Sequence, residues 1–192
     1  MQNNLLKNIL RDVAKSSATS TIALVGSILG LGLVWVNPAG AVTFGTNLIV
    51  DADAEASVGL RDTASAVSGW TGSGTLTSIP YGTAGFPSIT SPGPINRGNN
   101  FFSGGTSGVT NPFQFIDVSA IAGAIDTGTV RYDLSGFFGG KTDSDDDAGL
   151  RMVSYSQRGS ELEITRIGFY TKEDRANITG LLAASSSAVV PI

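Results

Sequence analysis

The 192-residue chain carries a net charge of −4 and contains neither cysteine nor histidine. The missing residues exclude disulfides, thiolate chemistry, a Ser-His-Asp triad and an ordinary zinc site. With 41% hydrophobic and 15% charged residues, the chain can bury the core of one domain, and it is short for two.

Residues 1–41 have the layout of an export signal. A basic start precedes the apolar run Ile22–Val36, which ends at Pro38 and the small residues 39–41. This run of 15 residues is shorter than the roughly 20 that a membrane-spanning helix needs. We therefore expect an N-terminal signal helix that is cleaved after Ala41, the alternative being an uncleaved anchor. The basic residues of the start are Lys7, Arg11 and Lys15.

Cleavage would also set the charge of the remaining domain, residues 42–192. It removes three basic residues and one acidic residue, which leaves 9 basic against 15 acidic side chains and a net charge of −6. Such a surface does not suit nucleic acid or anionic lipid. We expect an exported protein, periplasmic, at the cell surface or extracellular, that touches the membrane only through an uncleaved leader.

From residue 42 onward, short β-prone runs alternate with clusters of Gly, Ser, Pro and Asn. Residues 47–55 begin apolar and then alternate alanine with acid, and residues 68–79 contain two further short runs. Residues 80–100 hold four of the seven prolines. Because proline donates no hydrogen bond to a β-ladder, we expect this stretch to be loop.

Clearer strand patterns follow at residues 101–105, 112–118, 128–140, 148–156 and 161–170. In the third run, residues 130, 132 and 134 are apolar or aromatic while residues 131, 133 and 135 are polar, the period of a half-buried strand. The last two runs are joined by a hairpin-like link that contains Gly159.

Helical periodicity is scarce. Residues 119–128 suit one or two helical turns, and residues 172–184 suit either a short helix or an extended crossover. Seven or so short strands at regular spacing predict an all-β fold, an antiparallel jelly-roll sandwich, as one domain over residues 42–192.

Five stretches of the mature chain together resemble the galactose-binding-like jelly-roll family, which includes carbohydrate-binding modules and many exported bacterial proteins. They are "NLIVDADAEA", "GW", "SPGPINRGNNFFSGG", "FQFIDVSAIAGAIDTGTVRYDLSGFFGG" and "DSDDDAGL". The resemblance covers about residues 47–182. It implies a structural calcium between the first and last strands, with Asp53 or Glu55 as a ligand.

The chain departs from the family pattern at two places. Asp51-Ala52 stands where the family has Asn-Gly, and no closing strand with an aspartate-asparagine pair precedes the end of the chain. We therefore expect the domain to be truncated by one or two strands, with an open sheet edge able to pair with another chain.

Two groups of acids are candidate cation sites. Asp51, Asp53 and Glu55 have spacing two, so a strand would present all three on one face, and we select them as the calcium ligands. Residues 143, 145 and 147 match the start of an EF-hand loop, but Ala148 and Ser154 stand where that loop needs Gly and Glu. We interpret this second run as a solvated connection between two strands.

Carbohydrate binding would use aromatic faces with polar groups beside them. The residues selected for this role flank or lie within the proline-rich stretch and are Trp70, Tyr81, Arg97 and Asn100. A buried core position is the alternative for Trp70. No pair of acids stands out as catalytic, and we expect no enzyme activity.

The sequence therefore predicts an exported, non-catalytic binding protein that takes a carbohydrate and holds a structural calcium. One alternative is a structural or interaction protein of the cell surface without a small ligand. Another is a truncated fragment without function.

Overall fold

The computed structural model describes residues 17–24, 42–56 and 67–192. These residues form strands with very little helix, so the predicted all-β class is confirmed. The helical turns are a 3-10 turn, Ser119–Ile121, and α1, Ala122–Ile125, in the stretch where one or two turns were expected. The strands are β1 Ser17–Leu24, β2 Thr71–Ser73, β3 Thr77–Pro80, β4 Asn100–Ser103, β5 Val109–Ile116, β6 Arg131–Gly140, β7 Ala148–Tyr155, β8 Glu161–Gly168 and β9 Gly180–Val189.

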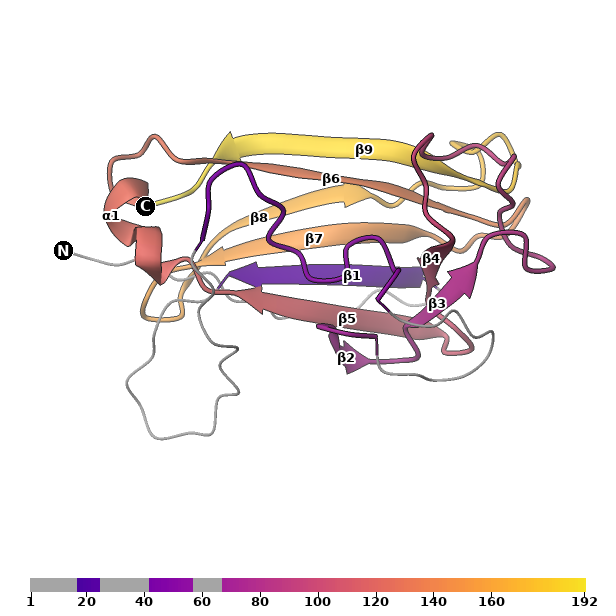
Figure 1. The fold of residues 1–192 in the computed structure, drawn as a ribbon, viewed down its shortest axis with the longest axis horizontal. Helices are drawn as coiled ribbons and strands as arrows, with labels where there is room; N and C mark the ends of the chain where they lie inside the picture. The colour runs from indigo at the N-terminus through magenta and orange to yellow at the C-terminus, as the bar shows by residue number, and fades with distance from the viewer. Residues whose placement is uncertain (1–16, 25–41, 57–66) are drawn as a thin grey trace.

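The strands form one large and two small sheets. The large sheet has five strands in the order β2-β5-β1-β7-β8, and β6 pairs with β9 and β3 with β4 in two-stranded sheets (Figure 1). Strand β1 runs parallel to both neighbours, whereas the other pairs are antiparallel. Among the described residues of 42–192, where antiparallel strands were predicted, every pairing is antiparallel, and the parallel strand β1 lies in the predicted leader.

Strand β1 comes from the stretch that we predicted to be a signal helix. Its backbone, residues 17–24, is extended and lies between β5 and β7 (Figure 1). The predicted basic start and the cleavage site after Ala41 lie outside the described residues. Within the described part of the chain, no helix is long and apolar enough to cross a membrane.

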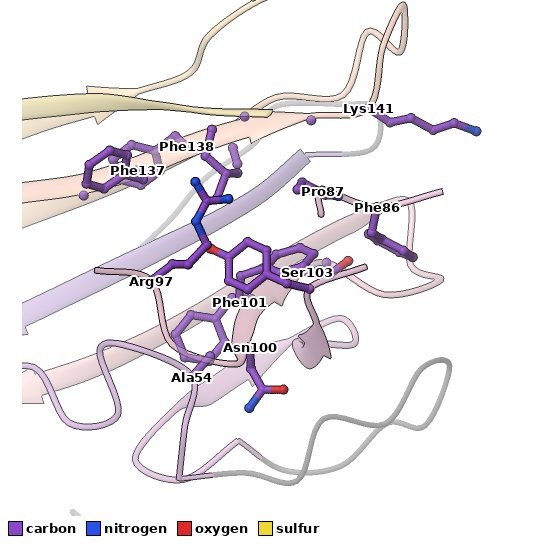
Figure 2. A pocket seen from close by; sticks show the side chains of 18 of the residues that line it. Ala54, Phe86, Pro87, Arg97, Asn100, Phe101, Ser103, Phe137, Phe138 and Lys141 are labelled. Carbon is purple, nitrogen blue, oxygen red and sulfur yellow. The ribbon is translucent and has the colours of Figure 1, made fainter. Parts of the chain in front are cut away.

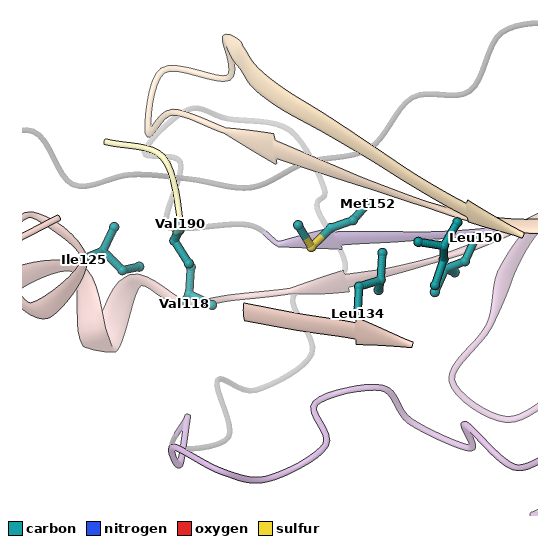
Figure 3. Packing of buried hydrophobic residues seen from close by; sticks show 7 residues of the cluster. Val118, Ile125, Leu134, Leu150, Met152 and Val190 are labelled. Carbon is teal, nitrogen blue, oxygen red and sulfur yellow. The ribbon is translucent and has the colours of Figure 1, made fainter. Parts of the chain in front are cut away.

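The main hydrophobic core lies between the β6–β9 sheet and the large sheet. Leu134 of β6 packs with Leu150 and Met152 of β7, and Val190 and Ile125 complete the cluster at its end near α1 (Figure 3). Burying each such side chain contributes roughly 1.5–3 kcal/mol to folding. This packing fixes β6 over β7 and so places the two strand ends that border the candidate site.

The alternation predicted for residues 128–140 is present, because Tyr132 and Leu134 of β6 are shielded while Arg131 and Asp133 are exposed. One other expectation is wrong, because residues 47–55 are turn and irregular chain and form no strand. For residues 172–184, either a short helix or an extended crossover was expected. Their last residues are extended and begin strand β9, which pairs with β6 along its whole length.

Candidate functional site

A pocket of about 690 Å³ opens beside the ends of strands β4, β6 and β7. One wall is the proline-rich connection from β3 to β4 together with β4 itself, and the other is formed by the ends of β6 and β7. Figure 2 shows Arg97 and Phe101 on the first wall and Phe137 and Phe138 on the second. Residues distant in sequence thus meet at one concave surface.

The first wall is aromatic. The rings of Tyr81 and Phe101 lie 4.9 Å apart between centroids, and Phe86 lies 6.0 Å from Phe101. Tyr81 follows β3 and Phe101 lies in β4, and these two strands pair antiparallel. The strand pairing therefore brings the rings together. Tilted contacts at these spacings are favourable for aromatic pairs.

Arg97 holds the loop that carries this wall. Its guanidinium donates hydrogen bonds to the carbonyl oxygens of Pro94, Ser88 and Ser91 at 2.8, 2.9 and 3.0 Å. The same group lies 5.2 Å from the centre of the Tyr81 ring, within cation–π range. Burial raises the pKa of the Tyr81 hydroxyl above 10.0, an effect that the Arg97 charge partly opposes. Tyr81 therefore stays a neutral hydrogen-bonding group at physiological pH.

Glu55 ties the turn before it to the start of β4. Its Oε1 accepts the backbone N–H of Asn100 at 2.7 Å, and its Oε2 accepts the side-chain amides of Asn99 and Asn100 at 3.1 and 3.3 Å. A Cβ at Gly98 would overlap this carboxylate, so a larger residue there would displace Glu55 from its hydrogen bonds. Both oxygens of Glu55 are thus engaged by protein donors, and its role here is to anchor the Asn100 edge of the pocket.

The three acids selected as calcium ligands do not converge. Asp51 lies in a turn at φ 48°, and its Oδ1 accepts the N–H of Ala56 at 2.9 Å. Asp53 Oδ1 accepts the N–H of Glu55 at 3.2 Å. The expectation that all three share one strand face is wrong because the segment turns. Among the described residues no group of three or more acids is close enough to hold a metal ion.

One oxygen in this turn still lacks a partner. Asp51 Oδ2 is buried and accepts no hydrogen bond. The turn itself is held by Gln114 of β5, whose amide exchanges two hydrogen bonds with the backbone of Val50, N–H to Oε1 at 2.9 Å and Nε2 to carbonyl oxygen at 2.6 Å. Sequence reasoning missed Gln114, since nothing in its pattern distinguishes it from other alternate residues of β5.

Trp70 lies apart from the pocket. It is 9% exposed, its ring packs edge-on against Phe102 at 5.8 Å, and its indole N–H points to the carbonyl oxygen of Asp51 at 3.5 Å. The core alternative for Trp70 therefore describes its position. The other predicted ligand residues, Tyr81, Arg97 and Asn100, do line the pocket together.

The acidic run is the connection from β6 to β7. Lys172 forms an ion pair with Asp145 at 2.9 Å, and this contact raises the pKa of the lysine. Arg175, only 4% exposed, donates hydrogen bonds to the carbonyl oxygens of Ser144 and Asp146 at 2.9 and 3.3 Å. The loop's conformation is thus fixed by two cations from the segment before β9.

This arrangement turns part of the acidic run toward the pocket. Asp146 and Asp147 line it, together with Lys141 and with Phe137 of β6. Sequence reasoning selected none of these four residues for the pocket, and it considered Asp147 only for a cation loop. The alternation in β6 could have identified Phe137, because it places a large aromatic residue on the polar face of the strand, where it is 45% exposed.

Comparisons with known proteins add no relative: no family model, no curated protein and no solved structure matches the chain.

Proposed function

We propose that this chain is an exported, non-catalytic binding protein whose pocket takes a carbohydrate. The observation that carries the proposal is the pocket itself, in which aromatic faces from two walls meet polar groups from the loops. Sugars present apolar C–H faces and a ring of hydroxyls, and this combination of flat rings and hydrogen-bonding groups is what such ligands need.

The size of the pocket supports a small ligand or the end of a longer chain. At about 690 Å³ it lies inside the roughly 300–1,000 Å³ range of small-molecule sites. Phe137 and Phe101 offer ring faces, while Asp146, Asp147 and Asn96 offer oxygen and amide groups for hydroxyls. Strands β4 and β6 hold Phe101 and Phe137, so these two rings would need little ordering when a ligand binds.

We also propose that residues 42–192 form a domain of the galactose-binding-like jelly-roll family. Its support is the all-β architecture together with the sequence stretches quoted above. A packed core between the β6–β9 sheet and the large sheet is compatible with a sandwich of this kind.

A structural calcium is part of the same proposal, with Asp51 as its carboxylate ligand. Its support is the buried, unpartnered Oδ2 of Asp51, because a buried carboxylate oxygen without a donor is costly unless a cation satisfies it. Asp53 and Glu55 would contribute indirectly, by stabilising the turn that positions Asp51, since their own oxygens accept protein hydrogen bonds.

A glycan array probed with the full chain tests the carbohydrate proposal. We expect binding to a restricted set of glycans that survives Trp70→Phe, because the indole lies outside the pocket. An array without any hit at micromolar protein contradicts the proposal. Hits that vanish in Trp70→Phe, with the fold intact by circular dichroism, place the ligand elsewhere and contradict the assignment of the pocket.

A further inference from the structure

Strand β9 lies at the rim of the molecule and has a partner strand on one side only. It pairs with β6 over its whole length, and no other strand of the described residues pairs with it (Figure 1). In an antiparallel pair, alternate residues turn their backbone N–H and C=O groups toward the partner, and the residues between them turn theirs away. The groups on the far side of β9 therefore need another source of hydrogen bonds.

Val190 shows which residues of β9 face β6. Its N–H donates to the carbonyl oxygen of Val130 at 2.8 Å, and these two residues continue the register in which Val189 stands opposite Arg131. Counting back along the ladder, the even-numbered residues of β9 turn their backbone groups toward β6. The odd-numbered residues turn theirs toward the other edge, and from residue 183 to residue 189 their side chains are exposed.

The first part of this edge is covered by the chain itself. Leu181 donates its N–H to the carbonyl oxygen of Pro92 at 2.9 Å, and the carbonyl oxygen of Ala183 accepts the hydroxyl of Tyr170 at 2.6 Å. Both contacts come from odd-numbered residues of β9 and from groups outside β6, which agrees with the alternation. Neighbouring segments thus close the edge as far as the carbonyl of Ala183.

The rest of the edge is open. Among the described residues, the backbone groups that Ser185, Ser187 and Val189 turn away from β6 have no hydrogen-bond partner. This stretch holds no charge and no proline, and its ladder with β6 has no bulge, so it lacks the devices that keep an edge strand from pairing. The edge strand β8 of the large sheet, in contrast, carries the charges of Glu161 and Arg166.

The open stretch is symmetric about Ser187, which selects a second copy of the same strand as its partner. In an antiparallel pairing with a two-fold axis at Ser187, this residue meets its counterpart and Ser185 meets Val189 of the second copy. Every outward N–H and C=O group of the three residues then finds a partner. Two residues further on, Ala183 would meet Pro191, which has no N–H, so the ladder ends where the edge is already closed.

The side chains of the open stretch fit this pairing. Ser187 would stand opposite a second serine, and Ser185 opposite Val189, a β-branched residue that is 39% exposed. No like charges meet across the axis. The chain's net charge of −4 therefore does not come into close contact with its copy at this edge.

We propose that two copies of this chain associate through their β9 strands, antiparallel and with the two-fold axis at Ser187. The association joins two two-stranded sheets into one sheet in the order β6-β9-β9-β6. None of the three residues of the open stretch lines the pocket. The inference therefore goes beyond the carbohydrate proposal and does not depend on what the pocket binds.

Disulfide trapping in the full chain tests the register, because the natural chain has no cysteine. In Ser187→Cys the two cysteines face each other with Cα atoms about 5.5 Å apart, a separation that a disulfide spans. In Ser185→Cys the two cysteines lie about 14 Å apart along the strands, too far for a disulfide. The double variant Ser185→Cys with Val189→Cys brings two cysteines opposite each other again.

With oxidised glutathione, we expect Ser187→Cys and the double variant to form a covalent dimer at least about tenfold faster than Ser185→Cys, as seen on non-reducing gels. Equal rates in Ser187→Cys and Ser185→Cys contradict the proposed register. All three substitutions replace exposed residues with one of similar size or smaller, and circular dichroism checks that the fold is kept.

Sedimentation equilibrium tests the association without a covalent bond. The mass of the wild type should rise with concentration from one chain toward two. Ser187→Lys should weaken the dimer by about tenfold or more, because two like charges meet at the axis. Ser187→Thr, which keeps a hydroxyl and suits a strand, and Leu162→Lys on the edge strand β8 should both dimerise as the wild type does.

Two results of this measurement overturn the proposal. The first is a wild type that stays monomeric at the highest concentration at which it is soluble. The second is a dimer that survives Ser187→Lys, and loss of the dimer in Leu162→Lys would then place the interface at β8 instead.

Discussion

Substituting Glu55→Gln should loosen the edge of the pocket and destabilise the domain. The carboxylate accepts three hydrogen bonds, from the backbone of Asn100 and from the side chains of Asn99 and Asn100. A glutamine can accept at one oxygen, but its amide group then faces amide donors. A hydrogen bond to a charged group contributes roughly 1.5–3 kcal/mol, and partial exposure of Glu55 places the total loss at about 2 kcal/mol.

In a chain of this size that loss lowers Tm by about 4–8 °C, measured by differential scanning calorimetry. The matched control is Asp53→Asn, which keeps an oxygen for the N–H of Glu55 and should cost less than about 0.5 kcal/mol. The reasoning is refuted by a Glu55→Gln chain that melts with the wild type, or by an equal loss in the control.

Three further predictions concern calcium, the acidic loop and pH. Millimolar calcium should raise the Tm of the wild type and of Asp145→Asn but not that of Asp51→Asn. An equal rise in all three proteins contradicts the proposed calcium site at Asp51. Arg175→Met should cost about 3 kcal/mol in urea unfolding, because three partly buried carbonyl oxygens lose a charged donor; a loss below about 1 kcal/mol contradicts this role. Burial raises the pKa of Tyr81 and Tyr132, so the folded state holds these protons more tightly than the unfolded state. The resulting stability is fully present below the unfolded value of about 10 and is lost as pH rises through the raised pKa values, and replacing both tyrosines with Phe should flatten that fall.

Local patterns predicted much of the fold. Alternation identified β6 because one of its faces lies on the core and the other faces outward, whereas β7 is buried along nearly its whole length and β8 is mostly half-buried. Gly159 at φ 82° lets the chain turn between β7 and β8. The pattern failed at β9, whose run of Ala and Ser has neither strong alternation nor branched residues. That segment is a strand because β6 offers it a complete ladder, which is tertiary information.

The N-terminal stretch shows the same limit. Residues 17–24 join small and polar residues to the start of the apolar run at Ile22, and an apolar segment near the start of a chain is typical of a leader. Their extended conformation follows from two neighbouring strands that supply hydrogen-bonding partners, and those partners are about 90 to 130 residues away in sequence.

The site could be predicted only in part. The prolines and the polar and aromatic residues between β3 and β4 predicted a binding loop, and Tyr81, Arg97 and Asn100 from this region do line the pocket. The opposite wall, with Phe137 and Asp146, comes from strand ends that only the packing of β6 over β7 brings near. Spacing two at residues 51–55 suggested a shared face, but the turn at Asp51 separates the acids.

The central claim is that the aromatic pocket binds carbohydrate, and the most direct test compares two exposed phenylalanines. Phe137 lines the pocket and is 45% exposed, whereas Phe115 of β5 is 40% exposed and does not line it. Titration calorimetry with the best array glycan should show at least tenfold weaker binding for Phe137→Ala, about 1.4 kcal/mol, and less than a twofold change for Phe115→Ala. Equal affinities in the two variants would contradict the account.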